Sequence, residues 1–239
     1  MSEVCFGFFT MPRQPLKYVA RHAKFRIPAN ALSERPELAA LIGECIAFCS
    51  QVEAYLAIML GAIMKTETGI SAAVFLSIRN SKAQREALTA AAQVGLQGRE
   101  LEMFSAIAII SQSIDNQRAD LAHGIFALSE DLPDDLLWMD SKDYTRLHIE
   151  NWNEISKNAT LVSLLSNSRS NDDAMRESFS VYRRADLESL RDEIKDLWRA
   201  VFLFTLSLRL PGNAIGEQEF QKLYTIPPIQ RALSRIRAG

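Results

Sequence analysis

The stretch RELEMFSAIAIISQSIDNQRADLAHG at residues 99–124 decides the fold class. Its apolar residues recur every three or four positions, as they do on the buried face of an α-helix. The stripe consists of Met103, Ile107, Ile110, Ile114 and Leu121. At 100° per residue these side chains fall within an arc of about 60°. The pattern predicts a long core helix from about residue 99 to His123, with Gly124 as its C-terminal cap.

Other segments share this helical periodicity. Long ones cover residues 33 to about 66, 70–96 and 187–210, and shorter ones follow at about 217–224 and 228–237. We expect the segment 70–96 to bend, with Ser81 as the N-cap of its second part, and Asp186 to cap the helix from residue 187. Long helices joined by short turns favour an antiparallel bundle.

The region 125–185 lacks this periodicity. Residues 136–139 and 144–149 flank the turn-like sequence DSKD and predict a small β-hairpin. Residues 178–182 alternate like a further strand. A short helix at 161–165 and a loop at 166–173 are expected between them.

These patterns predict an all-α fold, an antiparallel helical bundle of four or five long helices with a small β-hairpin insert. Residues 1–32 hold several prolines and no periodicity, which indicates an irregular N-terminal arm. Residues 33–239 then form a single bundle domain with a mixed insert at about 127–185. The amphipathic tail from Pro228 is expected to dock on its own bundle, with a partner or RNA as the alternative.

Composition and charge limit the function classes. The chain of 239 residues is 48% hydrophobic and 23% charged, which is typical of globular proteins. Its formal net charge is -2, so bulk charge gives no support to a dedicated duplex-binding protein, although a local basic site remains open. There is no signal-peptide pattern and no uninterrupted apolar run of about 18 residues, so we expect a cytoplasmic protein without a membrane span.

The cysteines indicate no redox or metal chemistry. Cys45 and Cys49 lie four residues apart in a helical pattern, so they share one helix face and are expected to be buried free thiols. No other Cys or His has the spacing that would complete a metal site, and we expect neither a metal nor a cofactor.

Two residues near the end of the predicted helix could carry chemistry. Arg118 lies about 50° from the centre of the apolar stripe, at the edge of the buried face, where a charged side chain is expected to have an anionic partner. That partner is either an anionic ligand such as phosphate or the carboxylate of Asp115, three residues earlier. His123 lies beside the last carbonyls of the helix, where an imidazolium is favoured and proton transfer is suited.

An Arg followed by four residues and a His at the end of a bundle helix, then Gly124 and Phe126, resembles the HEPN superfamily. The resemblance covers about residues 36–126 and the helix from 187. It implies a homodimer in which Arg118 and His123 of two protomers face one cleft. Arg118 would stabilise phosphate charge, and His123 would act as general acid or base while an RNA 2′-hydroxyl attacks the adjacent phosphate. Position 119 is Ala, where that superfamily usually has a polar residue.

The leading hypothesis is therefore a HEPN-like, metal-independent endoribonuclease in a toxin–antitoxin or phage-defence setting. Its partners would be RNA, a second copy of the chain and a cognate antitoxin or regulatory protein. The alternative is a non-catalytic helical dimer that binds RNA or a protein partner, and Ala119 and the acidic pI of about 6.0 favour it. An unrelated bundle that binds a small molecule is the third hypothesis.

Further residues are weaker candidates. RNA contact is considered for a basic group near the bend and for one carboxylate after Arg118, namely Lys82, Arg79, Arg85 and Asp120; a solvated face is the alternative for the basic group. Glu53 interrupts the apolar face of the first helix and is expected to pair with an Arg of a neighbouring helix. Apolar residues available for a dimer interface include Trp138, Phe126 and the stripe containing Ile229.

Overall fold

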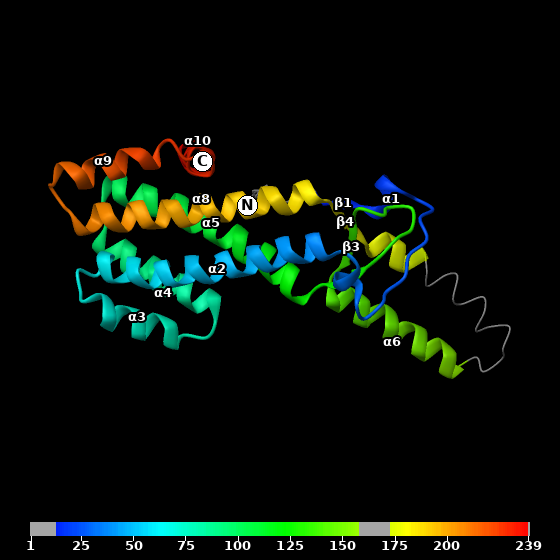
Figure 1. Cartoon of the computed structure of the whole chain (residues 1–239). Coiled ribbons are helices and arrows are strands. Elements are labelled where there is room, and N and C mark those ends of the chain that lie inside the picture. The colour runs from blue at the N-terminus through cyan, green and yellow to red at the C-terminus, as the bar shows by residue number, and fades with distance from the viewer. Residues whose placement is uncertain (1–12, 158–172, 239) are drawn as a thin grey trace. The chain divides into compact units, whose positions relative to one another are not determined.

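The computed structural model describes residues 13–157 and 173–238. They are mostly helical with a small antiparallel sheet, which confirms the predicted fold class (Figure 1). In chain order the elements are β1 (Gln14–Pro15), α1 (Leu16–Val19), η1 (Ala31–Glu34), α2 (Pro36–Ile63), α3 (Thr68–Ser77), α4 (Ser81–Gly95), α5 (Gly98–His123), β2 (Ile125–Ala127), β3 (Leu136–Met139), α6 (Ser141–Lys157), β4 (Ser180–Tyr182), α8 (Arg184–Arg209), α9 (Ala214–Leu223) and α10 (Pro227–Ala238).

The chain divides into two compact units. The helical unit contains the described residues 44–118 and 190–238. The mixed unit contains the described residues 13–43, 119–157 and 173–189. The predicted arm from residue 13 onward and the described part of the predicted insert both belong to the mixed unit, together with the first residues of α2 and α8 and the last turn of α5.

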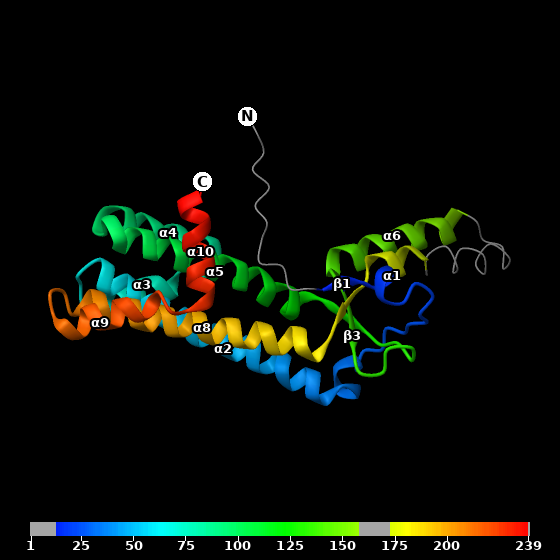
Figure 2. The ribbon, with the colours of Figure 1, turned by 90° about the horizontal axis from the view of Figure 1, so that it is seen from above.

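The core of the helical unit comes from the predicted apolar stripes. On α5 these are Met103, Ile107, Ile110 and Ile114, all at most 3% exposed. Helices α2 and α8 lie side by side in Figures 1 and 2, and the rings of Tyr55 and Trp198 meet between them with centroids 5.4 Å apart. Burial of these stripes supplies the main stabilisation of the unit, because each fully buried large apolar side chain contributes roughly 1.5–3 kcal/mol.

The C-terminal helices pack on the same unit. Phe220 of α9 contacts Phe204 of α8, with ring centroids 6.3 Å apart. On α10, Ile229 and Leu233 are buried, and Arg237 forms a 2.6 Å salt bridge with Glu102 of α5. The tail therefore docks on its own bundle, as expected, and its Ile229 stripe is not free for a dimer interface.

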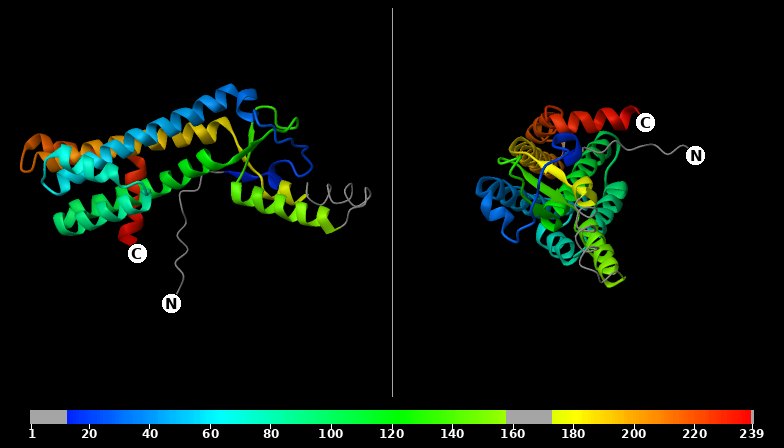
Figure 3. Two further views of the ribbon diagram at one scale, coloured as in Figure 1. Left: turned by 90° about the horizontal axis from the view of Figure 1, so that it is seen from below. Right: turned by 90° about the vertical axis from the view of Figure 1, so that its right-hand side faces the viewer.

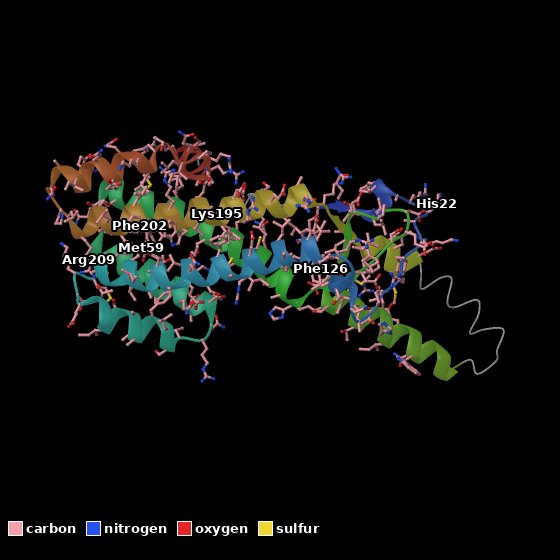
Figure 4. All side chains as sticks on the ribbon, viewed as in Figure 1. His22, Met59, Phe126, Lys195, Phe202 and Arg209 are labelled. Carbon is pink, nitrogen blue, oxygen red and sulfur yellow. The ribbon has the colours of Figure 1, made fainter. Side chains whose placement is uncertain are left out.

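Arg209 at the end of α8 fastens the turn between α2 and α3. Its guanidinium donates to the Thr66 carbonyl at 3.1 Å and to the Thr68 hydroxyl at 2.8 Å (Figure 4). The first helix accordingly ends at Ile63, and Thr68 starts the next helix.

Helix α2 is, among the described residues, the single helix long and apolar enough to cross a membrane. Half of its most apolar window is buried inside the protein. The core helix of a globular bundle has the same length and composition. Its buried residues include both Cys45 and Cys49, which are free thiols as predicted.

Two helix starts differ from the sequence prediction by a few residues. Asn80, not Ser81, is the N-cap of α4, because its side chain accepts hydrogen bonds from the backbone N–H groups of Lys82 and Ala83 at 2.9 and 3.2 Å. Helix α8 begins at Arg184, and Asp186 lies inside its first turn. The Asp186 carboxylate accepts from the Arg183 N–H at 2.9 Å, which still satisfies a free donor at the helix start.

The mixed unit is built on a four-stranded antiparallel sheet of order β1-β4-β3-β2. Green and yellow strands of this sheet are visible in Figure 3. Strand β3 is central and buried at all four positions, and it pairs with β2 on one side and β4 on the other. The prediction of strands at 136–139 and 178–182 is thereby confirmed in position. A buried apolar cluster includes Leu16, Leu137, Met139, Phe179 and Val181.

The predicted hairpin is wrong in its second half. Residues 144–149 lie in α6, not in a strand. The Asp140 side chain accepts from the Lys142 N–H at 2.7 Å, so the expected turn is the N-cap of a helix. Tyr144 and Leu147 then face the core at helical spacing, while Ile149 is 55% exposed. The predicted short helix at 161–165 and most of the loop at 166–173 lie outside the described residues.

From residue 13 onward, the predicted irregular arm contains the ordered elements β1 and α1 and the start of η1. Strand β1 pairs with β4, and the Leu16 N–H at the start of α1 donates to the Phe179 carbonyl at 2.8 Å. Leu16 is fully buried. Because Phe179 lies more than 160 residues away in the chain, local sequence periodicity does not predict this segment.

Gly124 has a different role from the one predicted. Its φ is not positive, so it does not act as a left-handed cap. A Cβ at this position would lie 1.7 Å from Nε1 of Trp138, which donates to the Asp120 carbonyl at 2.8 Å. Glycine is required here because the indole packs against the backbone. Trp138 is therefore committed to the fold of the mixed unit, 7% exposed, and does not form a dimer surface.

We predict that Gly124→Ala destabilises the protein and that Gly43→Ala does not. The new methyl group at position 124 would displace the indole of Trp138, and such overpacking costs about 2 kcal/mol. Gly43 lies inside α2, and no atom lies within 4 Å of an added Cβ. Ala at this position should therefore raise the free energy of unfolding by roughly 0.5–1 kcal/mol. Thermal unfolding measures both, and an unchanged or raised Tm for Gly124→Ala would contradict this packing.

Candidate functional site

Helix α5 carries both residues of the predicted motif. Arg118 and His123 are exposed, and Ala119 beside Arg118 is exposed as well. Five residues along one ideal helix turn the second side chain by about 140° from the first. Arg118 lines a cavity in the helical unit, whereas His123 lies in the final turn of α5, in the mixed unit, and is not among the residues of that cavity.

The cavity has a volume of about 210 Å³ and lies in the helical unit. Its apolar wall consists of Val52, Leu56, Phe75, Leu88, Ile114 and Leu197, none more than 9% exposed. Its polar wall consists of Glu53, Arg79, Ser81, Gln84, Arg85, Ser111, Asp115 and Arg118, with Cys49 beside them. We call it the arginine cavity, after Arg79, Arg85 and Arg118. The structure thus brings together four of the candidate residues named from the sequence, the three arginines and Glu53.

The connection between α3 and α4 holds two of these arginines in place. Arg79 lies in the short segment before α4, and Arg85 lies in the second turn of α4. The Gln84 carboxamide is 7% exposed and donates at 2.9 Å to both the Ile78 carbonyl and the Glu53 carboxylate of α2. Gln84 therefore fastens the connection to α2 and fixes the position of the arginines on either side of it.

Glu53 was expected to pair with an arginine, but it accepts from Gln84. The hydrogen-bond partner of the Glu53 carboxylate is thus the neutral Gln84, and Glu53 makes no salt bridge with a described residue.

The carboxylate of Asp115 pairs with Arg85 of α4, not with Arg118 of its own helix. Burial raises the pKa of the Asp115 carboxyl, and the neighbouring charges of Arg85 and Arg118 oppose that rise. Within the described part of the chain, neither Arg79 nor Arg118 makes a salt bridge. The ion pair proposed for Arg118 on sequence grounds is therefore absent among these residues, and two guanidinium groups of the cavity have no carboxylate partner.

Cys49 adds no nucleophile to the cavity. Burial raises the pKa of its thiol to about 12, and the negative charge of Asp115 adds to the effect while Arg118 opposes it. A thiolate is the reactive form of cysteine, so this thiol is inert near neutral pH. The residues that line the cavity include no histidine. Its polar groups are guanidinium and amide donors, hydroxyls and the carboxylates of Glu53 and Asp115.

The other predicted site residues lie elsewhere. Lys82 is exposed and forms a 3.7 Å pair with Glu86 one turn along α4, as a solvated side chain does. Asp120 belongs to the mixed unit and forms a 2.6 Å salt bridge with Arg13, whose guanidinium also lies 4.4 Å from the ring centroid of Trp138. Burial raises the pKa of the Asp120 carboxyl, and Arg13 opposes the rise. No pattern in the sequence pointed to Arg13 as the partner of Asp120.

Within the described ranges, no group of three or more His, Cys, Asp or Glu side chains is arranged to hold a metal ion. Comparison with known proteins gave no match to any family model, curated protein or solved structure.

We predict that both described cysteines are protected from modification in the folded protein. Burial raises the pKa of Cys45 to about 11 and that of Cys49 to about 12, so the thiolate fraction at pH 8 is very small. In a Cys5→Ser variant, a disulfide reagent should titrate no thiol over minutes without denaturant and two thiols in guanidinium chloride. Fast reaction of either thiol in the folded state would contradict the burial of these two side chains.

Proposed function

We propose that the protein binds RNA and that the arginine cavity receives a backbone phosphate. The observation that carries the proposal is the presence of two guanidinium groups, Arg79 and Arg118, without a carboxylate partner among the described residues. Guanidinium groups bind phosphate oxygens in a planar, two-pronged geometry. Both guanidinium groups are exposed, so a phosphate can reach them from solvent.

RNA is the favoured anion because of the resemblance of the α5 motif to the HEPN superfamily. A single strand suits the cavity better than a duplex, since its backbone can bend toward a recessed site. The chain as a whole carries a net charge of -2, so binding would depend on this local site. The same resemblance supports the remaining parts of the proposal: a cytoplasmic homodimer in a toxin–antitoxin or phage-defence setting, regulated by a cognate antitoxin or other protein.

Arg118→Gln should weaken binding of a single-stranded RNA by roughly tenfold or more, the usual effect of losing one charge-assisted hydrogen bond. The logarithmic salt dependence of binding should also fall by about 0.7, the value expected for one lost phosphate contact on a single strand. The control is Arg199→Gln, which removes an exposed charge of α8 outside the cavity. Fluorescence anisotropy with labelled RNA measures both effects. Equal losses in the two variants would sink the cavity as the binding site.

RNA cleavage is the second candidate function. It is favoured by one observation: the His123 side chain is exposed in the last turn of α5 and makes no hydrogen bond with a described residue, so its ring nitrogens are free for proton transfer. Because Arg118 and His123 diverge by about 140° on one helix, cleavage would need these residues from two facing protomers. Ala119 provides no polar group to orient the imidazole.

If the second candidate is correct, purified protein cuts single-stranded RNA in the presence of EDTA and leaves 2′,3′-cyclic phosphate ends. His123→Ala and Arg118→Ala abolish the cut without lowering the Tm, since both side chains are exposed. Ala119→Asn should raise the rate. A monomeric mass by light scattering at micromolar concentration, or cleavage that survives in His123→Ala, contradicts this candidate.

A further inference from the structure

The charges around the arginine cavity are not all positive. Three guanidinium groups face two carboxylates, those of Glu53 and Asp115. Their sum is 3 − 2, a net charge of +1 when all five groups are ionised. Both carboxylates are held in position, Glu53 by Gln84 at 2.9 Å and Asp115 by Arg85. They cannot move away from a ligand without breaking these contacts.

The cavity is also bounded by the core of the helical unit. Leu88, Ile114 and Leu197 of three different helices are at most 4% exposed, so part of the cavity wall is buried apolar surface. Surplus negative charge beside this buried wall is screened less by solvent than it would be on an open surface. The number of charges on the ligand therefore matters as much as its shape.

We propose that the arginine cavity selects a singly charged phosphodiester over a doubly charged terminal phosphate, and that Glu53 and Asp115 set this specificity. The inference rests on the proposed function and names the phosphate that the site takes. An internal RNA linkage or a cyclic nucleotide carries one negative charge and neutralises the cavity. A terminal phosphate carries about two negative charges at pH 7. One of them stays uncompensated and is repelled by both carboxylates.

The two ligand types can be compared with small molecules. 3′,5′-Cyclic AMP carries the diester charge, and AMP carries the same base and sugar with a terminal phosphate. At pH 7 about one tenth of a terminal phosphate is singly charged, because its second pKa is about 6. The Kd of AMP should therefore be at least about tenfold higher than that of cyclic AMP in calorimetric titration. AMP binding as tight as cyclic AMP, or tighter, overturns the inference.

Charge-neutral variants test the two carboxylates. Glu53→Gln keeps an oxygen that accepts from Gln84, and Asp115→Asn keeps the shape of its side chain. Each should reduce the preference for cyclic AMP over AMP by several-fold. The matched control is Glu86→Gln, which removes a charge from the exposed face of α4, outside the cavity. Unchanged preference in a folded Glu53→Gln variant, or an equal change in the control, contradicts the assignment.

Direct binding of a 5′-hydroxyl single-stranded RNA separates this inference from the proposed function. If RNA binds and AMP competes as well as cyclic AMP, RNA binding stands and the charge selection is wrong. If cyclic AMP binds in preference to AMP and RNA does not bind, the charge selection stands and the proposed function is wrong.

Discussion

The contact between the Arg85 guanidinium of α4 and the Asp115 carboxylate of α5 is the interaction on which the candidate site depends. It forms at a half-buried position, where burial raises the pKa of Asp115 and makes a partner necessary. Because Asp115 faces Arg85, Arg118 is left without the acidic neighbour that local spacing would give it. The ion pair between the two helices thus leaves Arg118 as an exposed cation without a carboxylate partner among the described residues.

Polar contacts close to this ion pair fix the start of α4. Gln84 fastens the start of α4 to α2 through two hydrogen bonds, and Asn80 caps the helix just before it. Apolar side chains from α2, α3, α4, α5 and α8 line the cavity. A cavity with charged walls costs stability, and natural proteins tend to keep such costs where binding or chemistry needs them.

The fold was predictable wherever local periodicity and burial agree. The apolar stripes of α2, α5 and α8 gave the correct helices because each stripe faces one continuous core. The prediction of a strand at 144–149 was wrong because residues 146–149 alternate polar and apolar residues like a strand. In the structure Asp140 caps a helix, and Leu147 is buried on its core face. The segment around Leu16 could not be predicted, since its contacts with Phe179 depend on chain folding and not on neighbours in sequence.

The candidate site was predictable only in part. Arg118 drew attention as a cation on the edge of an apolar stripe, and Arg79 and Arg85 as a basic group at a bend. That the three line one cavity depends on how α4 packs against α5, which spacing along one helix cannot reveal. Likewise, local spacing suggested Asp115 as the partner of Arg118, but in the structure Asp115 pairs with Arg85 of the neighbouring helix.

In the proposed complex, Arg79 and Arg118 both bind the same phosphate of the ligand. The most direct measurement is NMR of arginine side-chain Nε–Hε resonances during titration with a single-stranded RNA tetranucleotide. The account predicts that the resonances of Arg79 and Arg118 shift with one common Kd, while that of Arg199 stays unchanged. Shifts spread evenly over the surface arginines, or no shift at Arg79 and Arg118 under saturating RNA, would contradict it.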